Sequence, residues 1–428
     1  MTELLAPAGS LKSFRFACAY GADAIYAGQP RYSLRVRNNE FNYDNLKIAR
    51  EESLKQGKKL YIAVNIAPHN SKLLTFLKDM EPIINLGPDA LIMSDPGLIM
   101  MIRKQWPEQT IHLSVQANVT NYAAVQFWQD QGIKRIILSR ELSLEEIFAI
   151  REACPEMELE TFVHGALCIA YSGRCLLSGY FNHRDPNQGS CTNACRWKYD
   201  AHEATENSAS EIIPTATETQ PMVLQEKHRP GEYMPIFEDE HGTYIMNSKD
   251  LRAIQHVDTL VKNGIHSVKI EGRTKSHYYV ARTTQAYRRA IDDAKAKRPF
   301  NKSLMDELEK LSNRGYTEGF YRRHVHDEYQ QYDRGYSASE KQQFVGEVVD
   351  SNSSGELVTI AVKNRFSVGD ELEFVRPEGN FRFTLENMEN RHGEKITTAP
   401  GSGHVVKLAI PGEFKHLNDF SLLCVNHA

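Results

Sequence analysis

The chain has 428 residues, of which 41% are hydrophobic and 25% charged, and its formal net charge is −4. This composition is that of an ordinary globular protein, and no apolar run is long enough to cross a bilayer, so we expect no contact with a membrane. The start, MTELLAPAGSLKSF, lacks the pattern of a secretory signal, which predicts a cytoplasmic protein. The negative charge excludes a general attraction for polyanions, so any nucleic acid must bind a local basic surface.

Eight short β-rich segments end in polar residues, and segments with helical periodicity lie between them. The predicted strands are 3–5, 24–27, 60–64, 90–93, 111–115, 135–138, 159–163 and 267–270. Helices are predicted at 11–20, 43–56, 71–86, 123–131 and 143–152. Repeated strand–helix units of this number indicate an α/β fold, a closed TIM-like (β/α)8 barrel.

The connection between the seventh and eighth strands is far longer than a normal one, at roughly a hundred residues. We therefore predict a barrel domain at 1–335 with an insertion at about 165–265, whose stretch 201–218 is expected to be irregular. From 344 onward, short alternating segments with Gly and Asn turns replace the helical pattern. They predict a small antiparallel β-barrel domain at 342–428.

Polar side chains follow most of the predicted barrel strands, where loops build the active site in this fold. The candidate substrate-binding residues are Asn65, Asp95, Gln116, Asn118, Arg140, Glu141, Lys269 and Arg273. Each one alone is as easily a helix cap or a turn residue. So many polar strand ends together predict one shared pocket.

Three side chains are candidates for proton transfer, which requires a group that can gain and lose a proton near the pocket. Glu160 and His164 have the even spacing that places both on one face of the seventh strand, together with Phe162. Glu271 follows the eighth strand between two cations, where it could join an ion-pair network or face an anionic substrate. We take Glu160, His164 and Glu271 as candidate catalytic residues, although a histidine at a strand end is more often structural.

Four of the seven cysteines cluster within twenty-eight residues after the seventh strand: Cys168, Cys175, Cys191 and Cys195. Because the cytoplasm keeps thiols reduced, we predict a metal centre rather than disulfides. Thiolates suit zinc, copper(I) or an iron–sulfur cluster, and the spacing alone does not separate them. A metal centre at the carboxyl end of the seventh strand would face the pocket, which favours a reactive or electron-handling cluster over a structural zinc. We expect the other three to be buried thiols: Cys18, Cys154 and Cys424.

Several common enzyme signatures are absent from the chain. There is no HExxH helix, no GxSxG elbow, no Walker loop and no GxGxxG after a strand. A peptidase dyad of Cys168 and His164 is a formal alternative, but four clustered thiols exceed what such a dyad needs. Basic and aromatic residues interleave in RYSLRVR, CRWKY and GFYRRH, and they offer weak evidence for RNA contacts.

Several motifs resemble one known family. The segment ETFVHGALC, which continues to GRCLLS, is similar to the signature of the collagenase-like peptidases of unassigned catalytic type, peptidase family U32, and so are ELLAPAG, DAIYAG and KIEGRTKS. The resemblance spans nearly the whole chain. It implies an iron–sulfur cluster, of the 4Fe–4S type, and hydroxylation without molecular oxygen of tRNA, ribosomal RNA or ubiquinone precursors. HGTYIMNSKDL, CTNACRWKY and RPGEYM resemble the branch implicated in 5-hydroxyuridine at the tRNA wobble position, with prephenate as a required metabolite.

The resemblance also implies ligands and partners. Cys168, Cys175 and Cys191 match cluster ligands, whereas the fourth cysteine of some relatives falls where this chain has Arg252, so Cys195 is the nearest substitute. A cluster with three protein ligands and one open iron is the alternative. The expected partners are tRNA, a small-molecule carboxylate that the arginines and Lys269 could hold, and an electron donor. A peptidase and a non-catalytic RNA-binding factor stay open as other functions.

Overall fold

The computed structural model describes most of the chain. The described residues are 2–34, 39–168, 170–175, 177–178, 185–192, 195, 248–322, 341–351, 357–411 and 417–427, with the backbone of five short strands between 203 and 244.

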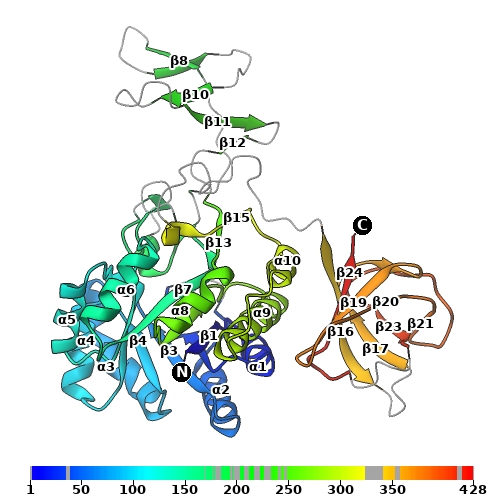
Figure 1. Cartoon of the computed structure of the whole chain (residues 1–428), viewed down its shortest axis with the longest axis horizontal. Coiled ribbons are helices and arrows are strands. Elements are labelled where there is room, and N and C mark those ends of the chain that lie inside the picture. Colours follow the sequence, from blue (N-terminus) through cyan, green and yellow to red (C-terminus); the bar gives the residue numbers. More distant parts are fainter. Residues whose placement is uncertain are drawn as a thin grey trace.

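A closed parallel barrel forms the larger domain (Figure 1). Its strands are β1 (Glu3–Pro7), β2 (Ala24–Gly28), β3 (Lys59–Val64), β4 (Ala90–Met93), β5 (Ile111–Leu113), β6 (Arg135–Ile137), β7 (Glu158–Ala166) and β14 (Ser267–Ile270). Each strand pairs in parallel with the next, and β14 pairs with both β7 and β1, which closes the barrel. The predicted TIM-like fold is therefore confirmed.

Helices follow the strands and cover the outside of the barrel (Figure 1). They are α1 (Leu11–Ala19), α2 (Tyr43–Lys55), α3 (Asn70–Asn85), α4 (Pro96–Gln105), α5 (Tyr122–Asp130), α6 (Leu144–Ala153), α8 (Val257–Lys262) and α9 (His277–Lys295). Several begin at a polar cap, because a side-chain oxygen there accepts from an otherwise unpaired amide, as Asp95 does from the Leu98 amide at 2.8 Å. None of the helices in the described ranges is long and apolar enough to span a membrane.

The segment between β7 and β14 contains several short strands. β8 (Glu203–Glu206) and β9 (Ile212–Thr215) form a hairpin, and β10 (Met222–Gln225), β11 (Tyr233–Asp239) and β12 (Gly242–Tyr244) form a second antiparallel sheet. The chain returns at β13 (Asp250–Arg252), which pairs antiparallel with the end of β7. The hairpin falls in the stretch 201–218 that was predicted to be irregular, and the remainder of that stretch lies outside the described residues.

The second domain is a curled antiparallel sheet, as predicted. Its strands are β16 (Gln342–Ser351), β17 (Leu357–Val362), β19 (Glu371–Val375), β20 (Phe381–Thr384), β21 (Met388–Asn390), β23 (Val405–Ala409) and β24 (Leu422–Asn426), and β18 (Phe366–Ser367) pairs with β22 (Thr398–Ala399). The strand β17 alternates between buried and less buried residues, which is the pattern of a sheet with one face on a core. From residue 341 on, the described chain contains strands and no helix.

The two domains meet at a buried charged interface beside α9 and α10 (Ser303–Glu309). Glu373 of β19 has a side chain only 2% exposed and binds Arg282 of α9 at 3.1 Å and Lys310 at 2.9 Å. The Tyr20 hydroxyl also donates to the Val375 carbonyl at 2.9 Å. Burial by itself raises the pKa of the Glu373 carboxyl, but the facing Arg282 and Lys310 hold it below its usual value. The ion pairs therefore stabilise the ionised Glu373 carboxylate and, with it, the contact between the two domains.

We predict that Glu373→Gln lowers the free energy of unfolding at pH 7 by about 1.5–3 kcal/mol, because it removes one of the two carboxylates that pair with the buried Arg282 and Lys310 and leaves them with Glu307. Since the folded pKa is depressed, the stabilisation by Glu373 is present above the pKa of the unfolded carboxyl and is lost as the pH falls towards the folded value. Urea denaturation at pH 7 and at decreasing pH measures both effects.

The matched control is Glu371→Gln on the same strand, whose carboxylate is 52% exposed and pairs with the exposed Arg382. It is expected to cost less than about 1 kcal/mol. Equal losses for the two variants would contradict the assignment of the interface to Glu373.

Candidate functional site

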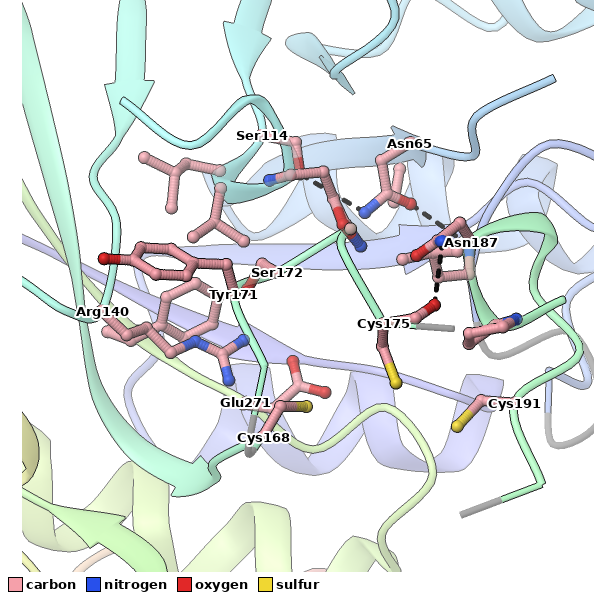
Figure 2. Close-up of a pocket in the computed structure, with 18 of the residues that line it drawn as sticks. Asn65, Ser114, Arg140, Cys168, Tyr171, Ser172, Cys175, Asn187, Cys191 and Glu271 are labelled. Carbon is pink, nitrogen blue, oxygen red and sulfur yellow. Dashed lines mark hydrogen bonds between the residues drawn. The ribbon is translucent and has the colours of Figure 1, made fainter. Parts of the chain in front are cut away.

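A cavity of about 140 Å³ lies at the carboxyl ends of the barrel strands, and described residues of the segment 167–195, called the thiol loop, line part of it (Figure 2). Six of the predicted polar residues line it: Asn65, Gln116, Arg140, Lys269, Glu271 and Arg273. All four clustered cysteines line it as well. The structure thus brings the thiols and most of the predicted polar residues together in one pocket.

The thiols of the pocket differ from the other cysteines of the chain. Figure 2 shows the sulfur atoms of Cys175 and Cys191 pointing toward each other, and Cys168 lines the same cavity. Cys168 is exposed, and Cys175, Cys191 and Cys195 are partly exposed. By contrast the three remaining cysteines are buried, as predicted, and burial raises the pKa of both Cys18 and Cys424 to about 12. Only the pocket cysteines are therefore accessible to a metal.

The donor set of the pocket fits an iron–sulfur cluster, because four thiols are the complete ligand set of such a group. Within the described ranges, no group of three His, Cys, Asp or Glu residues is placed to hold a single metal ion. A cluster shares its thiolates among several irons and spans more space than one ion does. All four thiols line this one cavity, as the ligands of such a group would.

Hydrogen bonds hold the thiol loop on the barrel. The Asn118 amide donates to the Ser172 carbonyl at 2.9 Å, and its oxygen accepts from Arg174 Nε at 3.0 Å. Within the loop, the Asn187 side-chain amide donates to the Cys175 carbonyl at 3.1 Å, and the Asn187 carbonyl accepts from the Ala67 amide, which follows β3, at 2.9 Å. These bonds fix residues 172–175 and Asn187 relative to the ends of the strands.

Charged side chains from β14 form the floor of the cavity. Lys269 Nζ binds Glu160 Oε1 at 3.0 Å and lies 4.4 Å from the centre of the Tyr26 ring, whose hydroxyl donates to Glu271 Oε2 at 3.0 Å. Burial lowers the pKa of Lys269, whereas the adjacent Glu160 carboxylate acts to raise it. Tyr26 was not among the predicted site residues, although its position two residues before the end of β2 places it on the interior face.

Two arginines add positive charge to the same cavity. The Arg140 guanidinium lies 4.1 Å from the centre of the Phe162 ring and donates to the Ala166 carbonyl at 2.8 Å. Arg273 reaches the cavity past Gly28, where a Cβ atom would lie 2.0 Å from its Nη1. Lys269 is already paired with Glu160, and the two arginines outnumber the one carboxylate of Glu271, so the described lining favours an anion.

The prediction that His164 shares a face with Glu160 and Phe162 is wrong. Phe162 pairs with Lys269 and His164 pairs with Ile270, so the ladder between β7 and β14 is irregular after Phe162 and the alternation is broken there. His164 consequently leaves the interior face and packs against tyrosines, with Nδ1 3.4 Å from the Tyr287 hydroxyl. Burial lowers its pKa to about 3, so the imidazole is neutral at neutral pH.

Four other predicted residues also lie outside the cavity lining and make structural contacts. Glu160 is fully buried between Lys269 and Arg135, Asp95 caps α4, Asn118 anchors the thiol loop, and Glu141 accepts from the Ser139 hydroxyl. Their contacts favour the simpler interpretation as cap and ion-pair residues. A catalytic role for Glu160 and His164, and substrate binding by the others, stay predictions.

A parallel barrel with an accessible, thiol-lined pocket at the carboxyl ends of its strands has the architecture of a TIM-barrel enzyme. The sequence pattern of Peptidase family U32 matches residues 9–331, and that of the Peptidase family U32 C-terminal domain matches residues 340–423. The chain belongs to Peptidase family U32.

Its relatives include curated proteins with names that describe RNA hydroxylation. The chain is 61% identical to tRNA hydroxylation protein P of Escherichia coli over 96% of this chain and 94% of that protein. It is 57% identical to tRNA hydroxylation protein P of Haemophilus influenzae, over 99% and 96%. It is also 31% identical to the 23S rRNA 5-hydroxycytidine C2501 synthase of Escherichia coli, over 68% of this chain and 39% of that protein.

The contacts of Asn118 predict that Asn118→Gly loosens the thiol loop. Asn118 has φ +51°, which glycine adopts without strain, so this change removes the side chain alone. The loss of two hydrogen bonds, each contributing about 1 kcal/mol, is expected to raise the rate of trypsin cleavage after Arg174 by about thirtyfold. The nearby cap variant Asn121→Ala serves as the control, since Asn121 bonds only within α5 in the described contacts. Equal cleavage of Asn118→Gly and the unaltered protein would refute the anchoring role.

Proposed function

We propose that this chain hydroxylates C5 of the wobble uridine in tRNA, in a reaction that is independent of molecular oxygen and requires prephenate and a cysteine-ligated 4Fe–4S cluster. The observation that carries the proposal is the meeting of four thiols and three cations in one barrel-mouth pocket. The names of the relatives add support, because two describe tRNA hydroxylation and a third describes formation of a 5-hydroxypyrimidine.

The chemistry of the product requires a redox centre. Replacement of the C5 hydrogen by a hydroxyl group oxidises the base by two electrons, which acid–base side chains alone cannot accomplish. A cluster held by Cys168, Cys175, Cys191 and Cys195 would supply electron transfer at the pocket, in exchange with a protein electron carrier. Cys195 is the proposed fourth ligand because it lines the cavity, whereas Arg252 pairs with Glu309 and lies over the Tyr316 ring.

The polar residues of the chain would bind the other reactants. Arg140, Lys269 and Arg273 provide the positive charge that the two carboxylates of prephenate need. Glu271 faces the same space and accepts a hydrogen bond from Tyr26, so its Oε2 atom is the proposed acceptor for the proton that leaves C5. The thiol loop above them would limit the access of water to the reacting base.

The pocket offers less support for peptidase chemistry. A Cys–His dyad needs the two side chains within hydrogen-bond reach of each other. His164 packs among tyrosines and does not line the cavity that Cys168 lines. No other histidine among the described residues lines that cavity.

We predict that Cys175→Ser and Cys191→Ser abolish both the cluster and the modified uridine. Protein purified without oxygen should be brown and contain iron, whereas these variants should lose the visible absorption and the iron. Mass spectrometry of tRNA from cells that carry only the variant should then show no 5-hydroxyuridine. The control Cys154→Ser removes a buried thiol outside the pocket and should keep both signals.

Three outcomes would overturn this function. Hydroxyuridine that persists without Cys175 or Cys191 would rule out the cluster mechanism. Zinc content with cleavage of peptides would establish the peptidase. A tRNA affinity that stays the same after the cysteines are replaced, together with no modification of tRNA by the unaltered protein, would indicate a non-catalytic RNA-binding factor.

The cation set predicts that Arg140→Gln weakens the binding of prephenate by roughly 10- to 100-fold, because a charge-assisted hydrogen bond is worth about 1.5–3 kcal/mol. Calorimetry on protein purified without oxygen measures the dissociation constant. Arg15→Gln is the control, since Arg15 pairs with Glu52 on the surface and lies outside the cavity. If Arg140→Gln bound prephenate as tightly as the control, the carboxylate would occupy another site.

A further inference from the structure

Tyr171 has an unusual environment for a tyrosine. It lies in the thiol loop between Cys168 and Cys175, lines the cavity, and is nevertheless 51% exposed. Its ring makes no aromatic or cation–π contact with any residue that the structure describes. An aromatic ring half exposed at the rim of a pocket is a surface that a planar ligand could cover.

The backbone holds Tyr171 in a preformed turn. The Arg174 amide donates to the Tyr171 carbonyl at 3.0 Å, and Asn118 binds the Ser172 carbonyl within the same turn. Gly173 allows this turn to lie against the barrel, because its φ is +75° and a Cβ there would be 2.8 Å from Gln116 Oε1. A ring presented on an anchored turn loses little further conformational freedom when a ligand covers it.

We propose that the Tyr171 ring is the platform on which a nucleobase of the RNA substrate stacks as it enters the pocket. The proposal rests on the proposed function and names a binding residue for it. Proteins that recognise single-stranded RNA stack its unpaired bases on aromatic rings, and enzymes that modify a base first take it out of its stack. A base on Tyr171 would lie at the cavity that Cys168 and Cys175 also line.

The surroundings of Tyr171 favour a nucleotide over an apolar partner. The same cavity contains Arg140, Lys269 and Arg273, whose positive charge favours a negatively charged ligand such as an RNA over an apolar one. Other exposed aromatic residues, such as Tyr122 and Phe127, lie on α5 and do not line the cavity. Tyr171 is thus an exposed ring at a cavity that also contains three cations, a combination that suits the planar base and the negative charge of a nucleotide.

Tyr171→Ala tests the inference, with Tyr171→Phe and Tyr122→Ala as companions. The probe is an anticodon stem-loop RNA that contains the wobble uridine, used with the cluster-loaded protein. Stacking contributes about 1–3 kcal/mol per base, so Tyr171→Ala should raise the dissociation constant and KM roughly 5- to 150-fold while kcat changes less. Tyr171→Phe should bind like the unaltered protein because it keeps the ring. Tyr122→Ala, which removes a tyrosine that is 55% exposed, should have no effect.

Each other result overturns the inference. Unchanged RNA affinity in Tyr171→Ala would show that no base stacks there, and a loss of iron or visible absorption in that variant would show that the ring only supports the cluster. Weaker binding of prephenate with unchanged binding of RNA would assign the ring to the metabolite. A different measurement tests the proposed function: it fails if the unaltered protein forms no 5-hydroxyuridine. The two failures are therefore distinguishable.

Discussion

A buried ion-pair network inside the barrel determines where the pocket can form. Glu160 of β7 binds Lys269 of β14 and Arg135 of β6, and Arg135 also binds Glu3 of β1 at 2.5 Å. The network therefore joins the first, sixth, seventh and last strands, including both strands that β14 pairs with to close the barrel. Since an unpaired buried charge is strongly destabilising, the partners hold one another in place. The result is a fixed cation, Lys269, at the floor of the cavity.

The cavity combines this rigid floor with a cover of a different kind. Strand ends supply Tyr26, Lys269 and Glu271, whose positions follow from the barrel ladder. The thiols instead lie on a long connection that depends on side-chain bonds from Asn118 and Asn187 for its placement. This division suits a reaction that needs fixed charges for an anionic reactant and an accessible face for a large substrate such as RNA. The same division separates the charged side chains at the strand ends from the thiols that would ligate a metal.

The sequence predicts the barrel well because each buried parallel strand carries its own hydrophobic signal, which does not depend on distant residues. The thiol cluster is equally visible, since all four cysteines are close along the chain. Strand alternation predicts the wrong face for His164 because it assumes a regular ladder, and the irregularity after Phe162 arises from pairing with a strand about a hundred residues away. Asp95 illustrates the other difficulty, because a polar residue after a strand can serve either a pocket or a helix cap.

The same irregularity bears on the fourth sulfur ligand. Arg252 stands opposite His164 in the antiparallel pair of β13 and β7, and side chains directly opposite each other in such a pair point to the same side of the sheet. His164 faces the tyrosines outside the cavity, and Arg252 lies over the Tyr316 ring on that side. A cysteine at position 252 would accordingly point away from the other three thiols in this arrangement. The geometry of β13 thus supports a ligand from the thiol loop itself, and Cys195 is the thiol of that loop that already lines the cavity with Cys168, Cys175 and Cys191.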